Sequence, residues 1–157
     1  MSNVKFTINT IKREKEIANM VSKNVEFFKI NKVRFTWPEK PVEEEYDINK
    51  YKEYKERIEK EWKKRGQGFV MRLLTFFHLP KKFQFIIEIS NYGPLGFYNA
   101  DTNTITINLN THLDAIDTIM HEMVHIMVEP FIKKYDIKYE RKEFIVDTIL
   151  KILKMDS

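Results

Sequence analysis

The feature that most constrains the fold is a pair of histidines, His121 and His125, inside the almost wholly apolar stretch of residues 115–128. Residues four apart lie on the same face of an α-helix, one turn from each other. Most neighbouring positions hold Ile, Met or Val, which makes this helix apolar on nearly every side and predicts that it is buried. Buried imidazoles need polar partners, so we expect the fold to bring a metal ion or acidic groups against this helix.

The stretch from His121 to His125, His-Glu-Met-Val-His, also has the residue types of a metal site. Two imidazoles one turn apart can bind one metal ion, and Glu122 follows closely enough to accept a proton from water on that metal. A catalytic zinc ion usually takes three protein ligands and leaves a fourth position for water. The chain has no cysteine and no histidine after His125, so a carboxylate is expected as the third ligand.

Two acidic residues of the predicted last helix, Glu143 and Asp147, are spaced four apart and therefore share one helix face. Asp147 lies within an apolar run, and burying a carboxylate without a partner costs several kcal/mol. One arrangement satisfies both residues. Glu143 binds the metal, and Asp147 accepts a hydrogen bond from the far ring nitrogen of a ligating histidine.

Four other residues are weaker candidates for metal binding. Glu129 directly precedes a proline, and Glu140 has no acidic residue four positions further on. His78 lies in an apolar context shortly before a proline, which favours a core or boundary position. His112 lies in the first turn of the predicted helix, where a surface role is expected.

The combination of His-Glu-x-x-His with Glu-x-x-x-Asp on a following helix resembles the gluzincin metallopeptidases, the thermolysin-like zinc enzymes. The resemblance covers residues 97–150. It implies that His121, His125 and Glu143 are zinc ligands. It also implies that Glu122 is the general base and that Asp147 is the partner of His121.

The same resemblance implies a tyrosine that stabilises the oxyanion formed during peptide hydrolysis. Tyr135 and Tyr139 lie between the two motifs, where thermolysin-like enzymes have such a tyrosine, and Tyr98 is a third candidate. The alternating strand predicted at residues 104–108 resembles the edge strand on which those enzymes lay an extended substrate. The expected partner is therefore a peptide or an unfolded protein segment bound along an edge strand.

The hydrophobic pattern predicts an α+β fold in a single domain of 157 residues. Residues 1–66 are expected to be helical, and residues 67–157 are expected to hold a sheet and the metal-binding helices. The predicted helices span residues 10–30, 47–66, 69–77, 111–128 and 139–154, with caps at Thr10, Asp47 and Thr111 and ends at Gly66 and Pro130. The predicted strands span residues 83–89, 97–99 and 104–109, in a small, mostly antiparallel sheet with residues 104–108 as an exposed edge strand.

The composition favours a soluble cytoplasmic protein. No apolar run approaches the ~20 residues of a membrane span, and the N-terminal residues lack the apolar run of a signal peptide. The absence of cysteine fits a reducing compartment. The net charge is +4, but Lys and Glu are interleaved along the chain and no nucleic-acid-binding motif accompanies them, which argues against a nucleic-acid partner.

Two functions of other classes fit the same residues. One is a regulatory metalloprotein, resembling the His-Glu-x-x-His proteins that switch off a repressor, with one protein partner as its only substrate. The other is a catalytically silent protein that keeps zinc for stability. Zinc content and peptide cleavage would separate both from a general peptidase.

Overall fold

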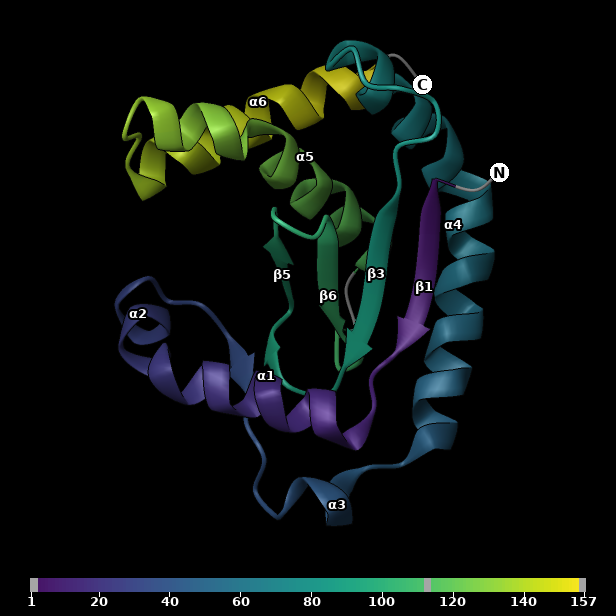
Figure 1. The fold of residues 1–157 in the computed structure, drawn as a ribbon, viewed down its shortest axis with the longest axis vertical. Coiled ribbons are helices and arrows are strands. Elements are labelled where there is room, and N and C mark those ends of the chain that lie inside the picture. Colours follow the sequence, from purple (N-terminus) through teal and green to yellow (C-terminus); the bar gives the residue numbers. More distant parts are fainter. Residues whose placement is uncertain (1–2, 112–113, 156–157) are drawn as a thin grey trace.

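The computed structural model describes residues 3–111 and 114–155, and it has the α+β fold that the sequence predicts. Its helices are α1 (Ile11–Lys23), α2 (Val25–Ile30), α3 (Val42–Glu45), α4 (Ile48–Phe76), α5 (Ala115–Lys134) and α6 (Tyr139–Met155). Its strands are β1 (Val4–Ile8), β2 (Phe35–Thr36), β3 (Phe85–Ser90), β4 (Gly93–Pro94), β5 (Gly96–Asn99) and β6 (Thr104–Asn108). A sheet stands in the middle of the molecule, with α4 beside β1 and α1 crossing one end of the strands (Figure 1).

The main sheet is mixed, with the strand order β1-β3-β6-β5. The antiparallel pairing expected from the sequence holds for β5 with β6. The strands β2 and β4, which the sequence did not predict, form a separate antiparallel pair. The pairings of β1 with β3 and of β3 with β6 are parallel. The first of these places Val4 opposite Phe85, and a pairing between segments so distant in sequence leaves no trace in local patterns.

The edge strand next to α5 is β5, so the prediction that residues 104–108 form an exposed edge is wrong. That segment is β6, which lies between β3 and β5 with both faces covered. Ile105 and Ile107 pack into the main core, and Thr106 on the opposite face is only 2% exposed. The Thr106 hydroxyl donates a 2.6 Å hydrogen bond to Glu88 of β3. The polar positions of this strand therefore belong to a buried hydrogen-bonding layer.

The first two predicted helix starts are confirmed. The Thr10 hydroxyl accepts the Arg13 N–H at 3.1 Å and caps α1, and the Asp47 carboxylate accepts the Asn49 N–H at 3.1 Å and caps α4. The single helix predicted over residues 10–30 is instead divided into α1 and α2 at Asn24.

Helix α4 runs through Gly66, which the sequence analysis predicted as a helix end. It joins the two helices predicted at residues 47–66 and 69–77, and the predicted division of the chain at residue 66 falls inside it. A Cβ atom at Gly66 would lie 2.1 Å from Cδ2 of Trp62, so only glycine leaves room for that ring. This glycine serves packing within a helix and does not end one.

Helix α5, which carries both histidines, is longer than predicted. Its N-cap is Asp114 and not Thr111, because the Asp114 carboxylate accepts two backbone N–H groups of the first turn while the Thr111 hydroxyl donates to Leu95. Pro130 lies within the helix and does not end it. Ile132, beyond the proline, is 7% exposed and packs into the main core, and such burial offsets part of the roughly 3 kcal/mol that an interior proline costs.

The main hydrophobic core holds α5 and α6 in place. It lies between the sheet and α4, α5 and α6, and its fully buried members include Ile87, Met123 and Val146. Helix α6 covers the predicted range of residues 139–154 and packs against α5. Within the described segments, no helix contains an apolar stretch that could cross a bilayer.

Candidate metal site

Three side chains from two helices converge at one point. His121 and His125 come from α5 and Glu143 comes from α6, and one ligand atom of each lies within 4.8 Å of the others. The two Nε2 atoms are 3.1 Å apart. The Glu143 carboxylate spans both rings, with Oε2 3.3 Å from Nε2 of His121 and Oε1 3.2 Å from Nε2 of His125. The structure thus brings together the three residues predicted as ligands.

The spacing of the two imidazole nitrogens fits two positions of a tetrahedral metal ion. Zinc bonds of about 2.0–2.1 Å at tetrahedral angles place neighbouring ligand atoms about 3.3 Å apart. The separation of 3.1 Å between the two Nε2 atoms is close to that value, and each Nε2 has a different Glu143 oxygen at a similar distance, Oε2 at 3.3 Å from His121 and Oε1 at 3.2 Å from His125. Two imidazoles and one carboxylate are also a donor set typical of catalytic zinc sites, with the fourth position left open.

The surroundings of the three residues favour a bound cation. Burial opposes ionisation of Glu143, but hydrogen bonds from His121 and His125 outweigh it and hold the pKa of the Glu143 carboxyl far below its usual value. Burial lowers the pKa of His121, and the nearby carboxylates of Glu143, Glu122 and Asp147 outweigh this and raise it overall. Two imidazoles therefore lie near three carboxylates, whose negative charge would offset that of a bound divalent ion.

Glu122 lies directly beside this cluster and is 8% exposed. Its burial raises the pKa of its carboxyl group. The backbone of β5 passes close to it, because a Cβ atom at Gly96 would lie 3.5 Å from Cγ of Glu122 and only 2.5 Å from Cγ2 of Thr118. Gly96 therefore permits the close approach of β5 to α5. The predicted strand began at residue 97, so the sequence did not indicate this role of Gly96, although a glycine at the start of a strand was an available signal.

Asp147 is placed differently from the prediction. Its side chain is 57% exposed, so the buried carboxylate expected from the apolar run is wrong. The reason is that this side of α6 faces solvent, where even Phe144 is 70% exposed. Asp147 Oδ1 nevertheless lies 3.6 Å from Nδ1 of His121, the nitrogen that points away from the cluster. This position suits the predicted role as the partner of His121.

Tyr98 of β5 forms one wall of the site. Its ring stacks on that of His125 with a centroid separation of 5.0 Å. Its hydroxyl donates to Glu129 at 2.6 Å and accepts from Nζ of Lys142 at 2.9 Å. Burial and the Glu129 carboxylate raise the pKa of Tyr98 well above its usual value. The hydroxyl is thus engaged, and Lys142 is a neighbour of the site that the sequence analysis missed.

The other two tyrosine candidates differ in position. Tyr139 lies one turn before Glu143 on the same face of α6, and burial and the charges of Glu143 and Glu122 raise its pKa. Tyr135 follows the last turn of α5, about 15 Å along the helix from His125 at 1.5 Å per residue. Its ring packs on Phe131, and it is 58% exposed. The structure therefore brings Tyr139, but not Tyr135, to the site.

The weaker ligand candidates stay outside the cluster. Glu129 accepts the Tyr98 hydroxyl, and neither it nor Glu140 belongs to the metal-binding group found among the described residues. His78 is exposed, at a left-handed backbone position with φ of 55° just after α4, and not in the predicted core or boundary position. His112 lies outside the described residues.

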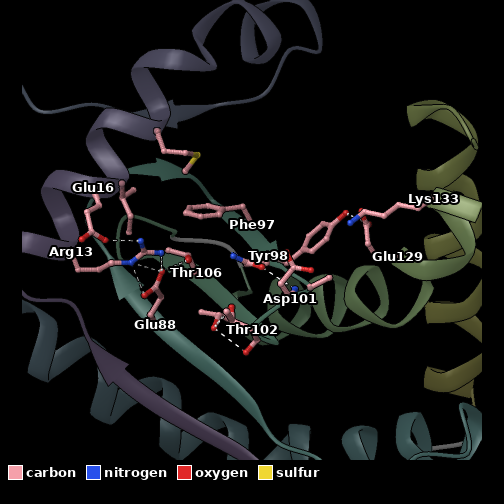
Figure 2. A pocket seen from close by; sticks show the side chains of 15 residues that line it. Arg13, Glu16, Glu88, Phe97, Tyr98, Asp101, Thr102, Thr106, Glu129 and Lys133 are labelled. Atoms are coloured by element: carbon pink, nitrogen blue, oxygen red, sulfur yellow. Dashed lines mark hydrogen bonds and ion pairs between the residues drawn. The ribbon is translucent and has the colours of Figure 1, made fainter.

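Two hollows adjoin this site. The first, which we call the β5 cleft, has a volume of about 590 Å³ and is lined by His121, Glu122, the Pro94–Gly96 segment and the Lys32–Arg34 segment. The second has a volume of about 760 Å³ and lies between α1, the end of β5 and α5 (Figure 2). Because only the β5 cleft is lined by a candidate ligand, it is the better candidate for a substrate site.

The charged and polar side chains at the floor of the larger hollow bind one another. Figure 2 shows Arg13 of α1 reaching towards Glu88, with Nη2 2.8 Å and Nε 3.1 Å from its carboxylate oxygens. Thr106 donates to the same carboxylate, and the hydrogen bond to Glu88 raises the pKa of Arg13. These contacts satisfy the buried charge and attach α1 to the sheet, which indicates a structural role.

Comparison with protein-family models, with curated proteins and with solved structures finds no match for this chain. The gluzincin resemblance therefore depends on residues 121–125 and 143–147 and on the geometry of their side chains, and family membership stays a prediction.

Proposed function

We propose that this protein is a zinc-dependent metallopeptidase of gluzincin type that hydrolyses peptide bonds in peptides or unfolded protein segments. The observation that carries the proposal is the convergence of His121, His125 and Glu143, with one ligand atom of each within 4.8 Å of the others and Glu122 buried directly beside them. Two helices distant in sequence supply these groups, and the cluster opens into the β5 cleft through His121 and Glu122. The absence of cysteine suits a reducing compartment, and we propose the cytoplasm as its location.

Each residue of the candidate site would have its own role in the reaction. His121, His125 and Glu143 would hold zinc, which when bound supplies a Lewis acid that polarises a peptide carbonyl and lowers the pKa of water. Glu122 would accept the proton of the attacking water and deliver it to the leaving amine. Asp147, through Nδ1 of His121, would keep that ring oriented with Nε2 towards the metal.

Tyr139 is the tyrosine best placed to donate a hydrogen bond to the oxyanion. The hydroxyl of Tyr98 is already engaged by Glu129 and Lys142, and Tyr135 lies about 15 Å along α5 from His125. Among the described residues, no hydrogen-bond partner engages the hydroxyl of Tyr139. Tyr139 lies one helical turn from Glu143 on the same face of α6, which supports this role.

An extended peptide could pair with the free side of β5. The Asn108 N–H donates to the Leu95 carbonyl, and antiparallel pairing alternates, so the backbone groups of Phe97 also face β6. Those of Gly96 and Tyr98 then point away from β6, and in the described part of the chain no further strand pairs with β5. These groups lie next to Glu122 and His125, which supports β-strand addition as the mode of substrate binding.

The direct experiment measures zinc content and casein cleavage by the purified protein, with a chelator and after zinc is restored. About one zinc per chain, cleavage that the chelator abolishes and recovery on adding zinc are expected. A folded protein that never binds zinc would contradict the proposal. Bound zinc without cleavage of casein or of any unfolded protein would favour the regulatory or silent zinc protein.

A further inference from the structure

One wall of the β5 cleft carries two cations, Lys32 and Arg34. Both side chains are exposed, and among the residues that the structure describes neither has an ion-pair partner. Both line the same hollow as His121 and Glu122. The cleft next to the candidate metal site therefore has unpaired positive charge on one side.

The segment that carries these cations is held in place. It connects α2 to β2, and the Val33 N–H donates to the Phe28 carbonyl at 2.8 Å. Beyond Arg34, Phe35 pairs with Pro94 in the two-stranded sheet, and the Thr36 hydroxyl donates to the Asn91 carbonyl at 2.7 Å. The cations thus extend from an anchored wall, which lowers the entropic cost of using them for binding.

The acidic residues that line the cleft do not neutralise Lys32 and Arg34. Asp117 is already engaged by Lys154 at 2.7 Å and by Arg65 at 3.4 Å. Glu122 is buried at the metal site. Most of the remaining lining is apolar: Val33, Pro94, Leu95 and Leu150. An occupant of this part of the cleft would meet an apolar surface with cations at its margin.

We propose that the β5 cleft selects peptides with an acidic side chain, Glu or Asp, next to the cleaved bond, and that Lys32 and Arg34 bind its carboxylate. The proposal rests on the proposed peptidase function for the identity of the occupant. Charge complementarity carries it, since an unpaired guanidinium can donate two parallel hydrogen bonds to a carboxylate and an ammonium adds a second cation. The peptide backbone would lie along β5, where Gly96 brings the strand against α5.

The experiment uses one peptide sequence in which each position around the scissile bond is in turn Glu, Gln or Lys. With zinc-loaded wild-type protein, we expect kcat/KM to be about fivefold higher for Glu than for Gln at one position, the gain typical of a partly exposed ion pair. At high salt this preference should shrink, because mobile ions screen exposed charges. Equal rates for Glu, Gln and Lys at every position would overturn the inference.

Variants assign the preference to the two cations. Arg34→Gln and Lys32→Gln should each reduce the ratio of Glu to Gln rates, and Arg34→Glu should reverse the preference towards the Lys peptide. The matched control is Lys50→Gln on α4, an exposed lysine outside both hollows that adjoin the metal site, which should leave the ratio unchanged. Two results would contradict the assignment of the preference to Lys32 and Arg34. One is a Glu preference that persists in Arg34→Glu, and the other is a loss of the preference in Lys50→Gln.

A binding measurement separates this inference from the peptidase proposal. The same peptides, labelled with a fluorophore, are titrated with Glu122→Gln protein, and fluorescence anisotropy reports their affinities. If wild-type protein cleaves no peptide, tighter binding of the Glu peptide that Arg34→Gln abolishes would still support the acidic preference of the cleft. If cleavage occurs without any preference, the acidic subsite is wrong and the peptidase proposal stands.

Discussion

The ring of Tyr98 lies against the ring of His125, with the centroids 5.0 Å apart and the planes inclined by 13°. This stacking joins the edge strand β5 to helix α5, which carries both histidines of the candidate metal site. Nδ1 of His125 is buried and has no hydrogen-bond partner among the described residues, whereas Nδ1 of His121 faces Asp147. The orientation of the His125 ring therefore depends on packing against Tyr98. The His121 ring also faces the carboxylate of Asp147, which helps to fix its orientation.

The first prediction follows from this packing. Tyr98→Ala should weaken zinc binding by about tenfold, since it removes the surface that orients His125, and lost support of a ligand typically costs 10- to 100-fold in affinity. Tyr98→Phe keeps the ring and should bind zinc nearly as tightly as wild type. Competition with a chromophoric chelator measures both affinities. Equal affinity of the alanine variant and wild type would show that stacking does not position His125.

The second prediction concerns Glu143, the third candidate ligand. Glu143→Gln removes the carboxylate that spans both imidazoles and should lower zinc affinity by more than about 100-fold. Glu140→Gln changes an exposed glutamate of the same helix turn and serves as the control, with unchanged affinity expected. Circular dichroism confirms that both variants are folded. If Glu143→Gln still retained zinc as tightly as Glu140→Gln, another residue would have to be the ligand.

Glu122→Gln provides the third prediction. The side chain lies beside the cluster but is not one of its three ligands, so the variant should retain about one zinc per chain. The amide does not accept a proton, and loss of a general base lowers rates by about 100- to 10,000-fold. Zinc content and casein turnover are measured on the same sample. Substantial cleavage by a zinc-loaded Glu122→Gln protein would exclude Glu122 as the base.

The sequence predicted the candidate site better than it predicted the surroundings of that site. Helical spacing placed His121 and His125 on one face and Glu143 on the next helix, and these are local relationships that a periodic pattern contains. The predicted burial of Asp147 is wrong, because the pattern around it is apolar although α6 is covered on one side only. An apolar stretch of sequence does not show which face of its helix the other elements cover.

Most features that the sequence did not predict depend on residues that are distant in the chain. The strand β1 is defined by parallel pairing with β3, and the wrong edge strand resulted from reading the polar residues of β6 as exposed. Gly66 was predicted to end a helix and Gly96 lay just outside a predicted strand, whereas each makes room for a neighbouring group, Trp62 in one case and Thr118 in the other. Strand pairing and the space left by a glycine depend on tertiary packing, which cannot be deduced from local patterns in a single sequence.

The fourth prediction tests a buried carboxylate outside the candidate metal site. Glu14 of α1 is fully buried, and it accepts hydrogen bonds from the hydroxyls of Tyr51 and Ser90 and from the Asn91 N–H. Glu14→Ala leaves these donors without their acceptor and should lower the free energy of unfolding by about 3 kcal/mol or more. Glu16→Ala, on the exposed side of the same helix, should change it by less than about 0.5 kcal/mol. Urea denaturation compares the two, and similar losses would contradict the assigned role.

The last prediction concerns the contact between β5 and α5. A methyl group at Gly96 would approach Cγ2 of Thr118 to 2.5 Å, so Gly96→Ala must displace the strand or the helix. Overpacking of this kind costs about 1–3 kcal/mol, and the displaced strand should also reduce peptide cleavage. Thr118→Ser removes the clashing Cγ2 and keeps a hydroxyl able to donate to the Asp114 carbonyl.

The double variant of Gly96→Ala with Thr118→Ser should therefore recover most of the lost stability, whereas Thr118→Ser alone should have little effect. Urea denaturation and casein turnover are measured for all three proteins. Recovery of stability without recovery of turnover would show that Gly96 is needed for substrate binding along β5 as well as for packing. Gly96→Ala as stable and active as wild type would mean that the approach of β5 to α5 can relax at no cost.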